Sequence, residues 1–258
     1  MPEDAHVTRP AVLVTGAARR LGAAIARRFA DDGWHVVIHY RRSAQEAEHL
    51  AAQLPCAETI GFDLANTGAV AAGVADLAAR LREWRTVVNC ASLFEFDSAT
   101  AIDARTFDRA MQVNAEAPVV LAQRFLATAK ASAGRCVINV LDQKLANINP
   151  DFFSYTMAKA ALGAATQMLA IAHRDSDDRI YGLSPGAMLP SFDQEPGEHQ
   201  DSGRMNLLQR LTDPTELADA AVFLAGGTLA SGQVVHVDSG QHLLEQYRDV
   251  LFLARENT

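Results

Sequence analysis

The chain has 258 residues, of which 49% are hydrophobic and 21% charged, and its formal net charge is −8 at pH 7. This composition predicts a globular core and excludes a disordered chain. The negative charge argues against nucleic acid as a partner, because a duplex-binding protein needs a basic face.

Short β-branched runs alternate with long alanine-rich stretches along the whole chain. The runs predict strands at 11–15, 35–40, 58–62, 85–90, 135–141, 179–184 and 233–237. The stretches between them predict helices at 21–32, 43–53, 68–83, 103–110, 115–130, 153–173 and 214–225. This alternation predicts an α/β fold, a Rossmann-type doubly wound parallel sheet of about seven strands with helices on both faces. We expect one domain, 1–258, with a substrate-loop lid at 187–212 and a C-terminal tail at 241–258.

A glycine-containing turn, VTGAARRLGAAIA (14–26), joins the first predicted strand to the first predicted helix. Gly16 permits a turn that a Cβ would obstruct, and Gly22 lets the helix start pack closely on the strand. The amides at that helix N-terminus can then hold a pyrophosphate. This context favours a dinucleotide site over a simple strand–helix turn. Arg20 replaces the middle glycine of the usual fingerprint and follows Arg19, and two guanidiniums suit a highly anionic ligand.

The second predicted strand ends in HYRRS (39–43), with no acidic residue for the ribose hydroxyls of NAD. Arg41, Arg42 and Ser43 would instead meet a 2′-phosphate, so we predict NADPH. The alternative is a solvated basic start to a helix. After the third strand, Asp63 can accept from the adenine amino group while Leu64 covers the ring, although an isolated Asp there is also an ordinary cap.

Tyr155 and Lys159 are four residues apart and share one helix face. A phenol has an unperturbed pKa of about 10, and a nearby ammonium lowers that pKa, which makes the phenol a better acid–base group. The alternative, a surface helix pair, is common. With a cofactor site upstream, we favour the catalytic interpretation.

Six segments fall in the order and spacing of the short-chain dehydrogenase/reductase family, which the chain resembles over roughly residues 9–240. They are TGAARRLG, HYRRS, NCAS (89–92), MQVNAEAP (111–118), YTMAK (155–159) and LSPG (183–186). Within the family, Arg20, the HYRRS cluster, an Asp at the usual serine position and the aromatic Phe94 look like the pteridine reductases. The chain departs from the family pattern at Cys90, at Tyr181 and in its long tail.

This resemblance implies a role for many single residues. The implied NADPH site comprises Gly16, Arg19, Arg20, Leu21, Gly22, His39, Tyr40, Arg41, Arg42, Ser43, Asp63, Leu64, Asn89, Ala91, Ser92, Tyr155, Lys159, Pro185, Gly186 and Met188. The implied substrate site comprises Arg20, Ser92, Phe94, Asp142, Tyr155 and Leu189, and the implied catalytic group comprises Asn114, Asp142, Tyr155 and Lys159. Asn114 resembles the family residue that kinks a helix and holds a water beside the lysine, and the family is typically a homotetramer.

Asp142 stands where a carbonyl reductase usually keeps a serine that donates to the ketone oxygen. An ionised carboxylate only accepts hydrogen bonds, so it would repel a carbonyl oxygen. A pterin instead offers N–H and amino donors, and its C=N bond needs a proton on nitrogen. A partly desolvated Asp142 with a raised pKa could relay that proton with Tyr155. The alternative is that Asp142 caps the loop after its strand.

We therefore predict an NADPH-dependent reductase that transfers hydride to a C=N bond of a dihydropterin-type substrate. An alternative is an NADPH-dependent carbonyl or 3-oxoacyl reductase that lost its serine. A non-catalytic NADP(H)-binding sensor is a third hypothesis, which the intact set of Tyr155, Lys159 and Asn114 disfavours.

Location and assembly follow from weaker signals. No run is apolar enough to span a membrane, and the first residues, MPEDAHVTRP, contain no apolar signal segment. Cys56, Cys90 and Cys136 match neither a disulfide framework nor a metal site, and the histidines show no metal spacing. We expect a cytoplasmic protein with no metal and no membrane partner. The segment 153–173 is apolar almost all round, which indicates a subunit partner.

Overall fold

The computed structural model describes residues 9–191 and 194–256. Its centre is a seven-stranded sheet in the order β3-β2-β1-β4-β5-β6-β7, and every neighbouring pair is parallel. The strands are β1 (Ala11–Val14), β2 (His35–Tyr40), β3 (Ala57–Gly61), β4 (Trp84–Asn89), β5 (Cys136–Val140), β6 (Arg179–Pro185) and β7 (Val234–Val237).

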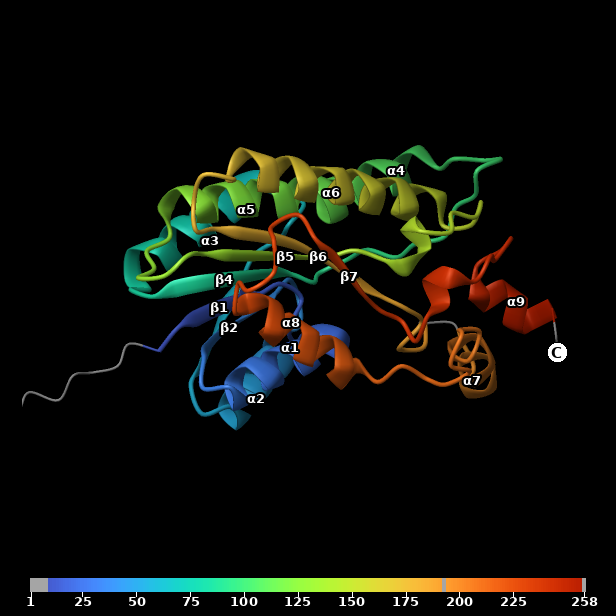
Figure 1. The fold of residues 1–258 in the computed structure, drawn as a ribbon, viewed down its shortest axis with the longest axis horizontal. Helices are drawn as coiled ribbons and strands as arrows, with labels where there is room; N and C mark the ends of the chain where they lie inside the picture. The colour runs from blue at the N-terminus through green and yellow to red at the C-terminus, as the bar shows by residue number, and fades with distance from the viewer. Residues whose placement is uncertain (1–8, 192–193, 257–258) are drawn as a thin grey trace, which may run out of the picture.

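Helices cover both faces of this sheet (Figure 1). One face carries α1 (Arg20–Asp31), α2 (Ala44–Gln53) and α8 (Pro214–Ala225), and the other carries α3 (Thr67–Arg80), α4 (Ala104–Met111), α5 (Ala117–Thr128) and α6 (Phe153–Ala172). The predicted doubly wound α/β fold is thereby confirmed, and the seven predicted strands lie within two residues of their observed bounds.

Fully buried strands explain why the sheet sits between two layers. All four residues of β1 are buried, and alternate side chains point to opposite faces. Val12 and Val14 pack in the core under α1 and α8, whereas Leu13 packs in the core under α3 and α5. The sequence of such a strand is a continuous apolar run, because helices cover both of its faces.

Several elements were not predicted from the sequence. Two short helices, α7 (Pro196–Gly203) and α9 (Val250–Glu256), lie within the predicted lid and tail and are close together at one end of the molecule (Figure 1). A π-helical turn, Gln112–Glu116, joins α4 to α5, and a short 3-10 turn, Gln143–Leu145, follows β5. No helix in the described part of the chain is long and apolar enough to cross a membrane.

The strand order reverses beside β1, whose neighbours are β2 and β4. In open parallel sheets, ligands bind outside the carboxyl ends of the strands at such a switch point. The turn after β1, the NCAS segment after β4 and the loop after β5 all belong to this edge.

Candidate active site

Two adjoining cavities, of about 620 and about 440 Å³, lie along the carboxyl edge of the sheet. They share five lining residues, Arg20, Leu21, Cys90, Ser92 and Phe94. The larger cavity extends over the ends of β1, β2 and β3, and the smaller one reaches Asp142, Tyr155 and Lys159. The two cavities together form one groove. The arginines after β2 lie at one end of it, and Asp142, Tyr155 and Lys159 lie at the other.

The turn after β1 requires both of its glycines, Gly16 and Gly22. Gly16 has φ +66°, and a Cβ there would lie 2.9 Å from the Cα of Ala91. A Cβ on Gly22 would lie 2.5 Å from the Gly16 carbonyl oxygen. A side chain at either position would fill the space where the helix start and the turn meet, so both positions require glycine.

Arg20 occupies the position of the middle glycine and keeps a left-handed backbone, with φ +54°. Its side chain lines both cavities, and its Nη2 donates to the Pro190 carbonyl oxygen at 2.6 Å. Arg20 therefore links the turn after β1 to the segment 187–212. Arg19 lines the larger cavity and is 3.8 Å from Glu46 in an exposed ion pair.

His39 and Thr15 hold this turn in place. The Gly16 amide donates to His39 Nδ1 at 3.2 Å, which leaves Nε2–H to donate to the Phe62 carbonyl oxygen at 3.1 Å. Burial lowers the pKa of His39 to about 4, so the ring is neutral at pH 7. Thr15, which the sequence did not single out, accepts from the amides of Cys90 and Ala91 through Oγ1 at 2.9 and 3.0 Å.

The larger cavity contains the rest of the predicted 2′-phosphate and adenine site: Tyr40, Arg41, Arg42, Ser43, Asp63 and Leu64. Arg41 and Arg42 are exposed, and within the described residues no carboxylate forms an ion pair with either. Asp63 accepts from the Ala65 amide at 3.0 Å, so its local capping role and a place in the cavity wall are both present.

The Asn89 side chain makes its hydrogen bonds inside the protein. It is buried, and its amide donates to Asn139 Oδ1 at 2.8 Å and to the Pro118 carbonyl oxygen at 3.3 Å. Among the described residues that line the two cavities, Asn89 is absent, whereas its neighbours Cys90, Ala91 and Ser92 are present. The protein interior therefore uses the side-chain amide of Asn89, and the assignment of Asn89 to the cofactor site stays a prediction.

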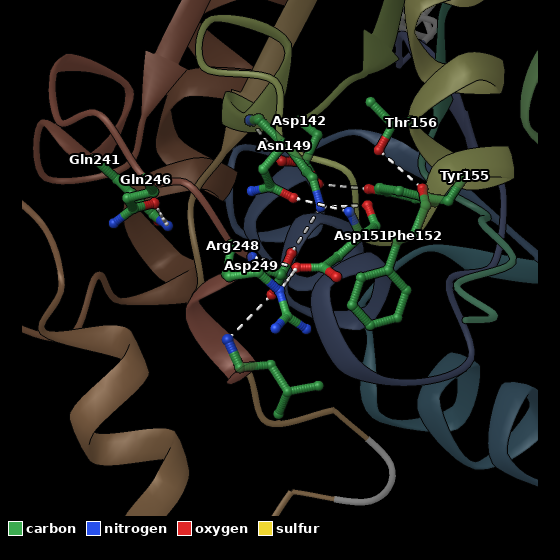
Figure 2. A network of polar contacts seen from close by, with 12 residues as sticks. Asp142, Asn149, Asp151, Phe152, Tyr155, Thr156, Gln241, Gln246, Arg248 and Asp249 are labelled. Atoms are coloured by element: carbon green, nitrogen blue, oxygen red, sulfur yellow. Dashed lines mark hydrogen bonds and ion pairs between the residues drawn. The ribbon is translucent and has the colours of Figure 1, made fainter. Parts of the chain in front are cut away.

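Asp142, Tyr155 and Lys159 meet in the smaller cavity. The Tyr155 hydroxyl donates to Asp142 Oδ2 at 2.6 Å (Figure 2). The Asp142 Oδ1 accepts from the Lys144 amide at 2.9 Å. Lys159 Nζ donates to the Val140 carbonyl oxygen at 2.6 Å and lies 5.8 Å from the centre of the Tyr155 ring. Pro185, Gly186, Met188 and Leu189 complete the wall on the side of β6.

Asn114 lies in the π-helical turn, where it is fully buried. Its side-chain oxygen accepts from the Leu93 amide and its nitrogen donates to the Leu93 carbonyl oxygen, both at 2.8 Å. Ser92 Oγ also donates to it, at 3.3 Å. The expected helix irregularity is present, and the side-chain amide holds the segment after β4.

Phe94 packs in a group of aromatic rings rather than alone. It stacks on Phe152, with ring centroids 4.0 Å apart and planes at 19°, and meets Tyr155 edge-on at 4.7 Å. Its remaining surface lines both cavities. The arrangement offers a flat apolar wall beside the phenol hydroxyl, as a planar ligand requires.

Comparison with known proteins agrees with this geometry. Residues 16–242 match the family model described as enoyl-(acyl carrier protein) reductase. The chain is 30% identical to pteridine reductase 1 of Leishmania tarentolae, over 92% of this chain and 97% of that protein. The chain belongs to the short-chain dehydrogenase/reductase family.

Solved structures place this short-chain dehydrogenase/reductase near two proteins that were crystallised with NADP. FolM alternative dihydrofolate reductase 1 from Brucella suis has a TM-score of 0.87 at 34% identity, covering 93% of this chain and 98% of that one. The angucycline C-6 ketoreductase LanV has a TM-score of 0.82 at 26% identity, covering 91% of this chain and 96% of that one.

Burial sets the proton affinities in this short-chain reductase. Burial raises the pKa of Asp142, and the charge of Asp249 adds to the rise, while hydrogen bonds from Tyr155 and the Lys144 amide oppose it. Burial and the charge of Asp142 also raise the pKa of Tyr155 well above 10. The expected lowering of the phenol pKa by Lys159 is wrong for this geometry, because burial and the contact with Asp142 raise that pKa. Burial lowers the pKa of Lys159 itself.

The Asp142–Tyr155 pair can therefore carry a proton. A carboxyl with a raised pKa holds its proton closer to neutral pH, and a protonated acid donates as well as accepts. The phenol and the acid both line the smaller cavity and are hydrogen-bonded to each other, so a proton lost from the phenol can be replaced by Asp142. One oxygen of Asp142 caps the turn, which confirms the capping expectation, and the other accepts from the phenol. The proton relay stays a prediction.

Residues distant in the sequence complete the cavity and were not predicted. Gln241, Asp249, Val250 and Leu251 of the tail line it, as do Ser191, Gln194, His199 and Ser202 of the lid.

The folded chain also gathers His236, Asp238 and His242, with ligand-capable atoms within 4.8 Å of one another, although the histidine spacing suggested no such group. In this group His242 Nδ1 is already 2.7 Å from Asp238 Oδ2.

Proposed function

We propose that this chain is an NADPH-dependent reductase of the C=N bond of a dihydropterin-type substrate. The observation that carries the proposal is the 2.6 Å hydrogen bond between Tyr155 and Asp142, at the position where a carbonyl reductase keeps a serine. Pteridine reductase 1 of Leishmania tarentolae and the FolM dihydrofolate reductase of Brucella suis are similar over nearly the whole chain, which supports this substrate class.

The groove fits NADPH by the shape and charge of its own residues. The Gly16–Gly22 turn leaves backbone space that a Cβ would fill, next to the N-terminus of α1, which favours a pyrophosphate. We assign Arg41, Arg42 and Ser43 to the 2′-phosphate, Asp63 and Leu64 to the adenine, and Lys159 to the nicotinamide ribose. When bound, NADPH supplies the hydride.

The protein residues would then orient the substrate and move one proton. We assign Phe94 to the flat face of the pterin, and Ser92, Arg20 and Leu189 to the surrounding wall. As the ring carbon receives hydride, the Tyr155 hydroxyl gives its proton to the neighbouring ring nitrogen. Asp142 then returns a proton to Tyr155, and its raised pKa keeps that proton available.

A second candidate is an NADPH-dependent carbonyl or 3-oxoacyl reductase. The raised pKa of Asp142 favours it too, because a protonated carboxyl can donate to a ketone oxygen as a serine would. The ketoreductase LanV is also similar to this chain, at 26% identity.

An NADPH-consumption screen separates the two candidates. The panel contains dihydropterins, dihydrofolate, an acetoacetyl thioester and simple ketones. We expect dihydropterin reduction, and we expect Asp142→Ser to lower it by on the order of 10²-fold, the usual contribution of a general acid, while ketone reduction is retained. Unchanged NADPH affinity in the variant is the control. An enzyme that reduces the thioester and leaves every dihydropterin untouched would contradict the proposal.

We further propose that the domain, 1–258, functions as a homotetramer in a reducing compartment such as the cytoplasm. Support for assembly comes from α6, where Met157, Met168 and Ile171 are exposed large apolar side chains. Support for the compartment comes from Cys56, Cys90 and Cys136, which are all free thiols.

A further inference from the structure

The C-terminal tail forms part of the substrate cavity. Asp249, Val250 and Leu251 line it together with Asp142 and Tyr155. Asn147, in the loop after β5, fixes the tail backbone by donating to the carbonyl oxygens of His242 and Leu244 at 2.6 and 3.0 Å. The tail is thus held against the same loop that begins with Asp142.

A buried lysine connects the tail to that loop. Lys144 is only 3% exposed, and its Nζ donates to Asp249 Oδ2 at 3.0 Å and to the Asp151 carbonyl oxygen at 2.7 Å. The Asp249 amide in turn donates to Asp151 Oδ2 at 2.9 Å, and Arg248 Nε donates to the same oxygen at 2.7 Å. In Figure 2, Arg248 and Asp249 lie beside Asp151, close to Asp142 and Tyr155.

Three links then join the tail carboxylate to the phenol. Asp249 pairs with the Lys144 ammonium, the Lys144 amide holds Asp142 Oδ1, and Asp142 Oδ2 holds the Tyr155 hydroxyl. A buried ammonium without a counter-charge is costly, and it attracts the next carboxylate within reach. The Lys144 charge already acts on the nearby Asp142 carboxylate, and without Asp249 it would act unopposed and favour the ionised form of Asp142.

We propose that Asp249 is a positioning residue that neutralises Lys144 and thereby leaves Asp142 free to take up and release the proton of the reaction. The tail therefore completes the active site chemically as well as sterically. This assignment concerns the proton affinity of Asp142 and deepens the proposed function, and only its consequence for turnover rests on that function.

The charged and titratable groups around Asp142 come from every side of the cavity. Tyr155 and Lys159 face it from α6, Lys144 from the turn after β5, and Asp249 from the tail. Arg20 from the turn after β1 and His199 from α7 line the same cavity. Of these groups, Asp249 supports the protonated form of Asp142, while Lys144 and Tyr155 favour the ionised form.

The test is an infrared titration of the Asp142 carboxyl in the NADPH-bound protein, with its band assigned by its loss in Asp142→Asn. The variants are Asp249→Asn, Lys144→Met and the double variant. Removing Asp249 should move the titration midpoint to lower pH by on the order of one unit, because Lys144 is then unopposed. Removing Lys144 should move the midpoint to higher pH, because Asp249 is then unopposed. The double variant should lie near the wild type.

Opposite shifts separate this role from a structural one, because a loosened cavity would move the midpoint in the same direction in both single variants. Arg248→Gln is the matched control: it changes the adjacent tail residue, leaves the Asp249–Lys144 pair intact and should not shift the midpoint. If Asp249→Asn does not fold, the upward shift in Lys144→Met and its reversal in the double variant still decide the matter. An unshifted midpoint in both single variants overturns the proposal.

Turnover gives an independent readout. With a dihydropterin, Asp249→Asn should lower kcat at neutral pH and recover part of it at acid pH, while NADPH affinity stays unchanged. If the wild type reduces no dihydropterin, the proposed function fails while the titration still decides the role of Asp249. If the wild type is active and the midpoints do not shift, the role of Asp249 fails and the function stands.

Discussion

At the residue scale, the protein makes one carboxylate serve two purposes. Asp142 Oδ1 caps the turn after β5 and Oδ2 accepts from Tyr155. The cap fixes the carboxyl in direction, and burial raises its pKa. A mobile or solvated Asp at this position would lose its proton at a lower pH than the buried Asp142 does.

The raised pKa of Asp142 predicts the pH dependence of reduction. The protonated acid persists to a higher pH than an ordinary Asp allows, so kcat should be high at acid pH and fall as pH rises through the raised pKa. Measuring kcat against pH at saturating NADPH checks this. In Asp142→Asn, which has no titrating carboxyl, that fall should disappear along with most of the activity. If kcat falls with rising pH in the same way in the Asn variant, the fall belongs to another titrating group.

Cofactor choice depends on the arginines after β2. Arg42 is exposed and lines the larger cavity without a carboxylate partner among the described residues. Arg42→Ala should therefore weaken NADPH binding by about 10-fold or more and leave NADH binding nearly unchanged, because only NADPH carries the 2′-phosphate. Fluorescence titration with both nucleotides measures this. Arg27→Ala, on the exposed side of α1, is the control. If Arg42→Ala weakens the binding of NADPH and NADH equally, Arg42 does not contact the 2′-phosphate.

At the element scale, the sequence predicted every strand of the sheet because each is a short apolar run between clear breaks. It also predicted a dinucleotide site at the carboxyl ends of the first strands, since Gly16, Gly22 and the arginines lie within one βαβ unit. The hydrogen bond of the Asn89 amide could not be predicted, because its partner, Asn139, is 50 residues away on the next strand. The short helix α9 was missed because it is held by contacts such as Arg255 with Glu198, at 2.9 Å, which join residues far apart in the sequence. Helix α7 has a local start signal, the capping box of Glu195 and Glu198, which the sequence prediction did not use.

The starts of β2 and β3 place a thiol beside an imidazole. His35 Nδ1 is 3.0 Å from Cys56 Sγ, and His35 Nε2 is 3.0 Å from Glu58 Oε1. The hydrogen bond from His35 lowers the pKa of Cys56, whereas burial raises the pKa of Cys90 to about 11 and also raises that of Cys136.

Cys56 should therefore react first with a thiol reagent, because the thiolate is the nucleophile. We expect iodoacetamide at neutral pH to alkylate Cys56 at least about 10-fold faster than the other two cysteines, with His35→Gln slowing it. Peptide mass spectrometry against time measures all three sites in one sample, so Cys90 and Cys136 are internal controls. Equal rates at the three sites would show that the imidazole does not activate the thiol.

At the scale of the whole molecule, the active site is closed by parts of the chain that are far apart in sequence. The turn after β1 contacts the segment 187–212 through the hydrogen bond of Arg20 to Pro190. That segment contacts the tail through Met205 and Gln246. The tail contacts the loop after β5 through Asn147. None of these contacts follows from local spacing, because each joins segments 41 or more residues apart. The sequence could single out the segment 187–212 and the tail, but it could not show that they meet.

Asn147 tests whether this closure matters for the substrate. Asn147→Ala removes two hydrogen bonds to the tail backbone, which should cost about 1–3 kcal/mol and lower Tm by a few degrees. We expect KM for the substrate to rise several-fold while NADPH affinity stays unchanged, since the tail lines only the smaller cavity. Asn66→Ala is the matched control, because it removes the α3 cap at a similar stability cost far from the tail. A rise in KM that is equal in both variants would show that lost stability, and not the released tail, is the cause.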